Sequence, residues 1–96
     1  MKVVNIRHQP YDIYIGRENK TFGLKASKWA NPFVIGPDGF RDDVLAKYEN
    51  WLLEHPELLN QLSELDGKTL GCWCHPQKCH GDILIKLLKT NKYLTF

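Results

Sequence analysis

The segment from Gly67 to Asp82 concentrates the side chains that can do chemistry. It holds all three cysteines of the chain, Cys72, Cys74 and Cys79, and two of its four histidines. Thiols and imidazoles can bind a metal ion or act as nucleophile and base, and cysteine also packs as a small apolar residue. The spacing leaves these three interpretations open.

Zinc binding is the first interpretation. The ligands would be three thiolates and one imidazole, namely Cys72, Cys74, Cys79 and His80. Residues two apart on a strand share a face, so the first two thiols can reach one ion. Adjacent helical side chains point about 100° apart, so His75 or His8 is the alternative to His80. The chain would then be a zinc-stabilised interaction module.

An anion site is the second interpretation. A strand, a proline-containing loop and a helix starting near Cys79 would offer backbone N–H groups and a positive dipole end to a phosphate or carboxylate. Gly81 and Asp82 belong to the same helix start. A helix start lowers a thiol pKa, which would make Cys79 a nucleophile with His80 beside it. We therefore expect a nucleotide-like or other phosphorylated ligand, and whether the chain is an enzyme stays open.

The third interpretation is structural. Cysteine is among the most buried residue types, and Cys72 falls within an apolar stretch. Core packing is therefore the expected role of Cys72, with Trp73 packing on the opposite face of the same strand.

A second polar segment, between residues 14 and 33, could supply the rest of a binding site. Trp29 is flanked by Lys28 and Asn31, so it could stack on a ring while its neighbours bind the ring edge. Arg17 in this segment and Arg7 near the amino terminus would add positive charge. The structural alternative is that Trp29 covers one end of the core.

The elements that must position these residues follow from hydrophobic periodicity. Strands are predicted at 2–6, 11–15 and 68–74, and helices at 40–54, 56–65 and 79–91, with a long loop at 17–31 and an edge strand or packed tail at 93–96. This order predicts one α/β domain spanning residues 1–96, a small sandwich with a short, mostly parallel sheet flanked by helices.

The topology bears on the site. If the strands containing Val3 and Leu70 run parallel, a ligand should bind beyond their carboxyl ends. Those ends carry Arg7 with His8 and Cys74 with His75. We therefore expect the two polar regions to converge.

Composition narrows the class of protein. The chain has 96 residues, of which 43% are hydrophobic and 25% charged, as in an ordinary globular domain. A net charge of +2 with mixed signs makes nucleic-acid binding through Trp29 and the lysines a weaker alternative. Three clustered cysteines are a poor disulfide framework, and no run approaches the roughly 20 apolar residues of a membrane helix. We expect a cytoplasmic protein without a membrane partner.

Four stretches together resemble a known family of small phage and bacterial proteins. They are Asn5–Arg7, Tyr14–Arg17, Ser27–Phe33 and Gly67–Asp82, the last containing Cys-Trp-Cys-x-Pro-x-x-Cys-His-Gly-Asp. The family is domain of unknown function 4326. Ala30 departs from its pattern, which usually has glycine there, and the stretch after Arg17 is longer than usual.

The resemblance implies a site but no established reaction. The family pattern leaves the position of His75 open, so His80 is the better site histidine. The Pro-x-x-Cys-His run before a helix is also similar to domain of unknown function 488. That similarity favours a strand–loop–helix ligand site over a zinc knuckle.

Overall fold

Three short parallel strands form the sheet in the computed structural model, which describes residues 1–91. The central strand β3, Thr69–Cys72, lies between β1, Lys2–Asn5, and β2, Ile13–Tyr14. In register, Leu70 of β3 pairs with Val3 of β1 and with Ile13 of β2. The predicted short parallel sheet is confirmed, whereas the expected strand at 93–96 lies outside the described residues.

Both faces of β3 are covered, which explains its apolar sequence. Leu70 and Cys72 face the main core and are buried. On the opposite face, a Cβ on Gly71 would lie 2.6 Å from the Tyr11 ring and 2.7 Å from Ile6. The chain between β1 and β2 therefore crosses this face of the sheet, and glycine leaves the room it needs.

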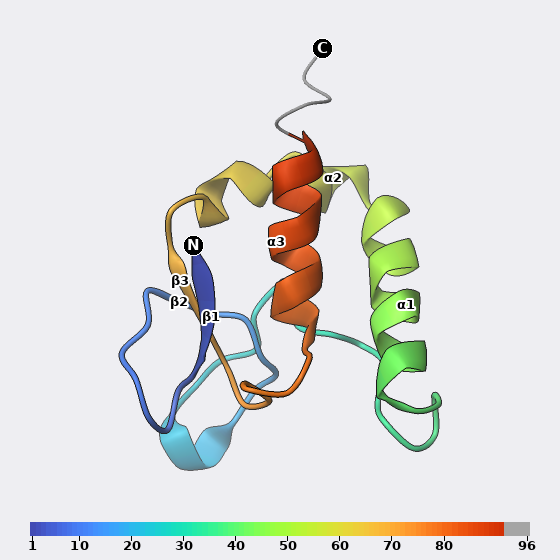
Figure 1. The fold of residues 1–96 in the computed structure, drawn as a ribbon. Helices are drawn as coiled ribbons and strands as arrows, with labels where there is room; N and C mark the ends of the chain where they lie inside the picture. Colours follow the sequence, from blue (N-terminus) through green and yellow to red (C-terminus); the bar gives the residue numbers. More distant parts are fainter. Residues whose placement is uncertain (92–96) are drawn as a thin grey trace.

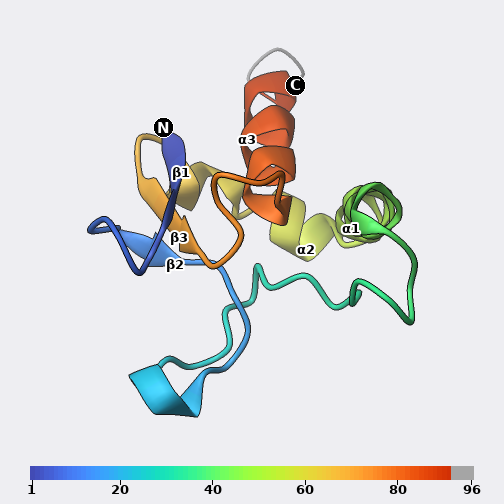
Figure 2. The ribbon, with the colours of Figure 1, turned by 60° about the horizontal axis from the view of Figure 1, so that its bottom comes forward.

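The helices lie on the other face of the sheet. They are α1, Arg41–Leu53, α2, Pro56–Leu59, and α3, His80–Asn91, with 3-10 turns at η1, Lys20–Phe22, and η2, Leu62–Leu65. Figures 1 and 2 show α3 between the sheet and α1. The α/β class is confirmed, but these helices cover one face, because the crossing chain occupies the other. No helix within residues 1–91 is long and apolar enough to cross a membrane.

One buried hydrogen bond joins the long loop to the helical layer. The Tyr48 hydroxyl of α1 donates to the Trp29 carbonyl at 2.6 Å. Both side chains belong to the core, and Trp29 is only 1% exposed. Burial raises the pKa of Tyr48, so the hydroxyl stays protonated and keeps donating. The 17–33 loop is therefore anchored to α1 near its carboxyl-terminal end.

Ala30 fits this loop without strain. No non-glycine residue among those described has a positive φ, so alanine here needs no left-handed backbone. Its N–H donates to the Ser27 carbonyl at 3.1 Å, closing a turn just before the Asn31–Pro32 pair. Alanine is thus accommodated here by ordinary backbone geometry.

Gly81 sets how closely α3 approaches the sheet. A Cβ at Gly81 would lie 2.7 Å from Val3 Cγ2 and 2.9 Å from Ile15 Cδ1. We predict that Gly81→Ala lowers the free energy of unfolding by about 1–3 kcal/mol through overpacking, although alanine favours helix. Urea unfolding followed by circular dichroism measures this change.

The matched control is Thr90→Ala, an exposed position on the same helix. It should change stability by no more than about 0.5 kcal/mol. A stabilised Gly81→Ala protein would show that the contact with β1 is not tight.

Candidate functional site

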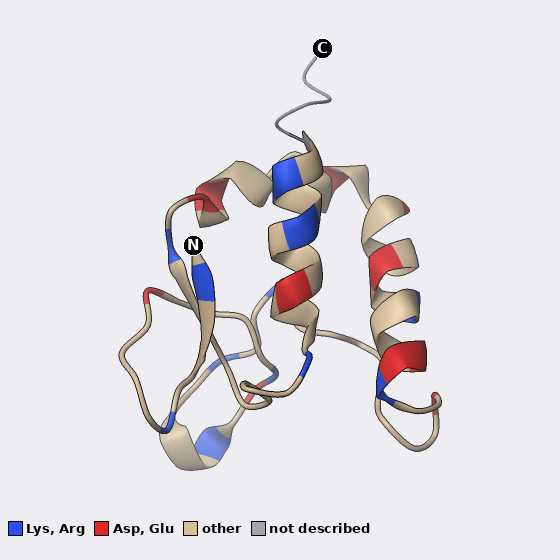
Figure 3. Cartoon of the chain, in the orientation of Figure 1, with Lys and Arg blue, Asp and Glu red and all other residues tan. Residues whose placement is uncertain are grey.

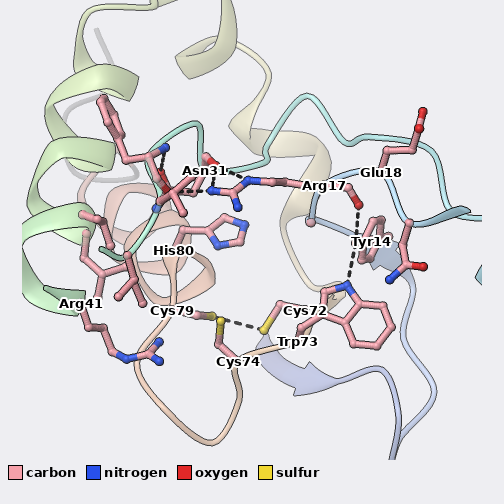
Figure 4. Close-up of a pocket in the computed structure, with 17 residues that line it drawn as sticks. Tyr14, Arg17, Glu18, Asn31, Arg41, Cys72, Trp73, Cys74, Cys79 and His80 are labelled. Carbon is pink, nitrogen blue, oxygen red and sulfur yellow. Dashed lines mark hydrogen bonds between the residues drawn. The ribbon is translucent and has the colours of Figure 1, made fainter. Parts of the chain in front are cut away.

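A cavity of about 430 Å³ lies beyond the carboxyl ends of β2 and β3 (Figure 4). One wall follows β2 and includes Arg17, and a second is the apolar segment around Val34 and Ile35. The first turns of α1 and the thiol-bearing segment from β3 to α3 complete it. Its volume falls within the ~300–1,000 Å³ typical of small-molecule sites. We call this cavity the strand-end pocket.

Two of the three thiols in the pocket wall touch each other. Cys72 at the end of β3 and Cys79 just before α3 place their sulfurs 3.3 Å apart. The Gly81 N–H also donates to the Cys79 sulfur at 3.3 Å. Cys74 also lines the pocket and is half-buried. The segment from β3 to α3 thus brings all three thiols to one cavity.

The thiol contact corrects the expected acidity of Cys79. A hydrogen bond from the Cys79 thiol lowers the pKa of Cys72 to about 6, helped by the N–H groups of His75 and Cys74 against the cost of burial. The same bond, together with burial, raises the pKa of Cys79. The expectation that its helix-start position lowers this pKa is therefore wrong, because the contact with Cys72 and burial outweigh the effect of the helix start. The opposite directions of these two shifts favour the thiolate on Cys72 rather than on Cys79.

His80 is held by Ile15, just after β2, and by Tyr48 of α1. Its Nε2 lies 2.6 Å from the Ile15 carbonyl oxygen, which can only accept, so Nε2 carries the hydrogen. The Tyr48 ring meets the imidazole edge-on at 5.2 Å. Burial, with a further contribution from the charge of Arg17, lowers the pKa of His80. The imidazole is therefore neutral at pH 7, with Nδ1 as its acceptor toward a ligand.

Arg17 fastens two walls of the pocket together. Its Nε and Nη2 donate to the Asn31 carbonyl at 3.0 and 2.8 Å, and Nη2 donates to the Phe33 carbonyl at 2.6 Å. The Tyr14 hydroxyl donates to the Arg17 carbonyl and accepts from Trp73 Nε1. Arg17 and Asn31, both predicted at the site, are thus brought together there.

Arg41 is a pocket residue that the sequence interpretation missed. It begins α1 and donates from Nη1 to the Lys78 carbonyl at 2.8 Å and from Nη2 to Gln77 Oε1 at 2.7 Å. The sequence did contain a signal for this role. A cation in the first turn of a helix is disfavoured by the helix dipole, so its presence there indicates another function. Here it ties α1 to the loop that precedes Cys79.

Three residues predicted to bind ligand lie elsewhere. The Arg7 guanidinium lies 5.0 Å from the centre of the Trp73 ring and outside the pocket wall. Lys28 pairs with Glu64 at 2.8 Å. The buried Trp29 ring donates from Nε1 to Glu64 at 3.3 Å, and it has no exposed face for stacking.

The expected convergence of the strand ends occurs, since Asn5 Nδ2 donates to the carbonyls of Trp73 and His75.

The start of α3 satisfies most of its own N–H groups. The Cys79 N–H donates to Asp82 Oδ2 at 3.1 Å, and the Asp82 N–H donates to the Cys79 carbonyl at 3.0 Å. With Gly81 bound to the Cys79 sulfur, few donors remain for a ligand. Asp82 is therefore a helix cap and Gly81 a packing residue. The guanidinium groups are the stronger anion donors of this pocket.

The proposed zinc ligands do not fit a zinc site. Among residues 1–91, no three His, Cys, Asp or Glu side chains gather so that they could hold a metal ion. Thiolates bound at ~2.3 Å to tetrahedral zinc lie roughly 3.8 Å apart, wider than the Cys72–Cys79 contact. The set Cys72, Cys74, Cys79 and His80 is thus arranged as a thiol pair with a neutral histidine, and it yields no mechanism through zinc.

Comparison with known proteins assigns the family. The model of a family described as domain of unknown function, DUF4326, matches residues 2–90. The chain belongs to this family. The DUF4326 domain is also similar to a protein of Acanthamoeba polyphaga mimivirus, "Uncharacterized protein R718". The two are 40% identical over 91 residues, which cover 84% of this chain and 69% of the viral protein. No solved structure matches.

Buried, neutral His80 makes the stability of this DUF4326 domain depend on pH. Because its pKa is lower in the folded state, the unfolded chain binds more protons below the ordinary imidazole pKa of about 6.5. We predict that stability falls as pH drops from about 7 to 5, and that His80→Gln flattens this fall by about 1 kcal/mol. Urea unfolding across this range measures both slopes.

His8→Gln, a substitution at an exposed histidine, is the matched control. The lowered pKa of Cys72 also makes stability fall as pH drops, and both variants retain this contribution. Equal slopes in His80→Gln and wild type would show that the imidazole does not titrate differently in the two states.

Proposed function

We propose that this DUF4326 domain binds a small phosphorylated, nucleotide-like ligand in the strand-end pocket. The observation that carries the proposal is the pair of guanidinium groups, Arg17 and Arg41, that enter one pocket from different elements. Figure 4 shows His80 between them. Arginine is the side chain best suited to bind phosphate oxygens, because its planar N–H groups match their geometry.

Both guanidinium groups keep N–H groups free for a ligand. Arg17 uses Nε and Nη2 on the Asn31 and Phe33 carbonyls, which leaves the two N–H groups of Nη1. Arg41 uses one N–H on each of its two contacts in the described chain and keeps three. The existing bonds orient both groups before a ligand arrives, which reduces the entropy lost on binding.

The rest of the pocket suits a less polar part of the same ligand. Val34 and Ile35 line it and are 42% and 48% exposed, an unusual placement for aliphatic side chains. Leu45 of α1 extends this apolar wall. A ring or sugar carried by the phosphate would cover these side chains, while His80 Nδ1 could accept a hydrogen bond from a ligand hydroxyl or amine.

The position of the pocket agrees with this proposal. In open parallel sheets, ligands bind beyond the carboxyl ends of the strands, where the pocket lies. Figure 3 shows Lys and Arg recurring in the loops at that end of the sheet, while both signs of charge mix on the helices. Such a distribution raises the local concentration of anions without making a continuous basic stripe.

The test is thermal unfolding and calorimetric titration with inorganic phosphate, ribose 5-phosphate and nucleoside mono- and diphosphates, with unphosphorylated nucleosides as the chemical control. We predict that at least one phosphorylated compound raises Tm by several degrees, since a ligand at 100 times its Kd adds about 2.7 kcal/mol. Arg41→Gln should weaken that binding about tenfold or more, because a charge-assisted hydrogen bond is lost.

Arg7→Gln is the matched control, since its guanidinium lies on Trp73 outside the pocket. Equal loss of affinity in both variants, or no stabilisation by any phosphorylated compound, would overturn the proposal. A single-stranded oligonucleotide in the same panel tests the nucleic-acid alternative. Binding that is lost in Arg7→Gln alone and falls steeply with salt would favour that alternative.

A further inference from the structure

The contact between Cys72 and Cys79 joins two elements that are seven residues apart in sequence. One sulfur belongs to the last residue of β3 and the other to the residue before α3, and they lie 3.3 Å apart within the pocket wall. A disulfide requires about 2.05 Å between sulfurs, so the two atoms need to approach by only about 1.2 Å. Small changes in two side-chain torsions can supply a movement of this size.

The surroundings of the pair stabilise one thiolate. The Cys79 thiol and the N–H groups of Cys74 and His75 favour the charged form of Cys72, whose pKa falls to about 6. The thiolate is the reactive form of cysteine toward oxidants and disulfides. At pH 7 the pair therefore holds a nucleophilic sulfur and, in contact with it, a thiol that can complete a disulfide.

Access to the pair is through the strand-end pocket. Cys72 and Cys79 are 1% and 2% exposed, yet both line the strand-end pocket. A small, uncharged oxidant can enter a cavity of this kind, whereas another protein's disulfide cannot reach the sulfurs. The geometry selects for a reactant of a few atoms.

We propose that Cys72 and Cys79 form a redox-active pair that reduces a small hydroperoxide and closes to an intramolecular disulfide. The Cys72 thiolate attacks one peroxide oxygen, the O–O bond breaks, and the departing oxygen takes a proton and leaves as water or an alcohol. Cys72 is then a sulfenic acid. The Cys79 sulfur attacks it, the S–S bond forms, and the second oxygen leaves as water with the Cys79 proton. Two thiols are oxidised and one peroxide is reduced by two electrons.

Cys74 provides an internal control for this chemistry. It is the most exposed of the three cysteines, so exposure alone would make it the first to be oxidised. It has no sulfur contact of the kind that joins Cys72 to Cys79 within the described chain. The proposal therefore predicts selectivity opposite to the order of exposure.

The deciding experiment treats the native wild-type protein with one equivalent of hydrogen peroxide, blocks free thiols after denaturation and maps the tryptic peptides. Cleavage after Lys68, Lys78 and Lys86 separates Cys79 from the peptide that holds Cys72 and Cys74. We predict a chain lighter by two hydrogen atoms, with these two peptides disulfide-linked and one blocked thiol, at Cys74. Dithiothreitol should restore three free thiols.

Three single variants assign the roles of the sulfurs. Cys74→Ser should keep the link and the wild-type rate, whereas Cys72→Ser should react with peroxide about tenfold or more slowly. Cys79→Ser should stop at a sulfenic acid on Cys72, which dimedone traps. Circular dichroism checks that each variant is folded, and the wild-type peptide map stands even where a variant does not fold.

Three outcomes would overturn the proposal: a link between Cys74 and Cys79, oxidation that produces only chains joined to each other, or three free thiols after treatment. None depends on Arg17 or Arg41, so failure here would leave the phosphorylated-ligand proposal in place. Failure of the phosphorylated-ligand proposal would likewise leave the redox proposal in place, because the peptide map needs no ligand.

Discussion

The hydrogen bond between His80 and the Ile15 carbonyl is the interaction on which the site depends. It joins the first residue of α3 to the backbone just after β2 at 2.6 Å. Gly81, the next residue, lets the helix approach β1 closely enough for that bond to form. The start of α3 is thereby fixed against the sheet, and with it the Cys79 sulfur against Cys72. A shift of α3 by the width of one methyl group would separate both contacts.

Three of the polar side chains in the motifs of this sequence hold this arrangement in place. Asn5 fastens the segment after β3 by donating to two of its carbonyls, and Arg17 fastens the loop at Asn31 and Phe33. Asp82 caps α3. In a sequence, such polar side chains look like ligand-binding residues, because the same N–H donors can bind a backbone carbonyl or a ligand oxygen. The structural and the ligand-binding role of Arg17 differ only in the N–H groups that its contacts leave unused. These groups can be identified in the structure but not in the sequence.

The fold was more predictable from sequence than the site. The apolar run at β3 and the i, i+4 pattern of α1 and α3 report burial directly, so periodicity predicts the elements, and their order predicts the α/β class with a parallel sheet. The stretch predicted as one helix at 56–65 instead divides into α2 and η2. The extended regions predicted at 2–6, 11–15 and 68–74 are shorter in the structure, and only the carboxyl ends of β2 and β3 lead into the pocket.

The roles of the site residues depend on tertiary contacts that the sequence does not reveal. Trp29 sits between Lys28 and Asn31 in the chain, but it points into the core, where Tyr48 binds its carbonyl. The acidity of Cys79 is reversed by a thiol seven residues away, although its helix-start position alone would lower its pKa. Arg41 reaches the pocket from α1 across a long separation in sequence. In each case a single tertiary contact overrides the local pattern.

The shortness of the strands has a consequence for how these molecules behave toward one another. The sheet edges are β1, with four residues, and β2, with two. These edges offer too few backbone N–H and C=O groups for a neighbouring copy to add a strand to the sheet. The architecture thus discourages association of copies through their sheet edges.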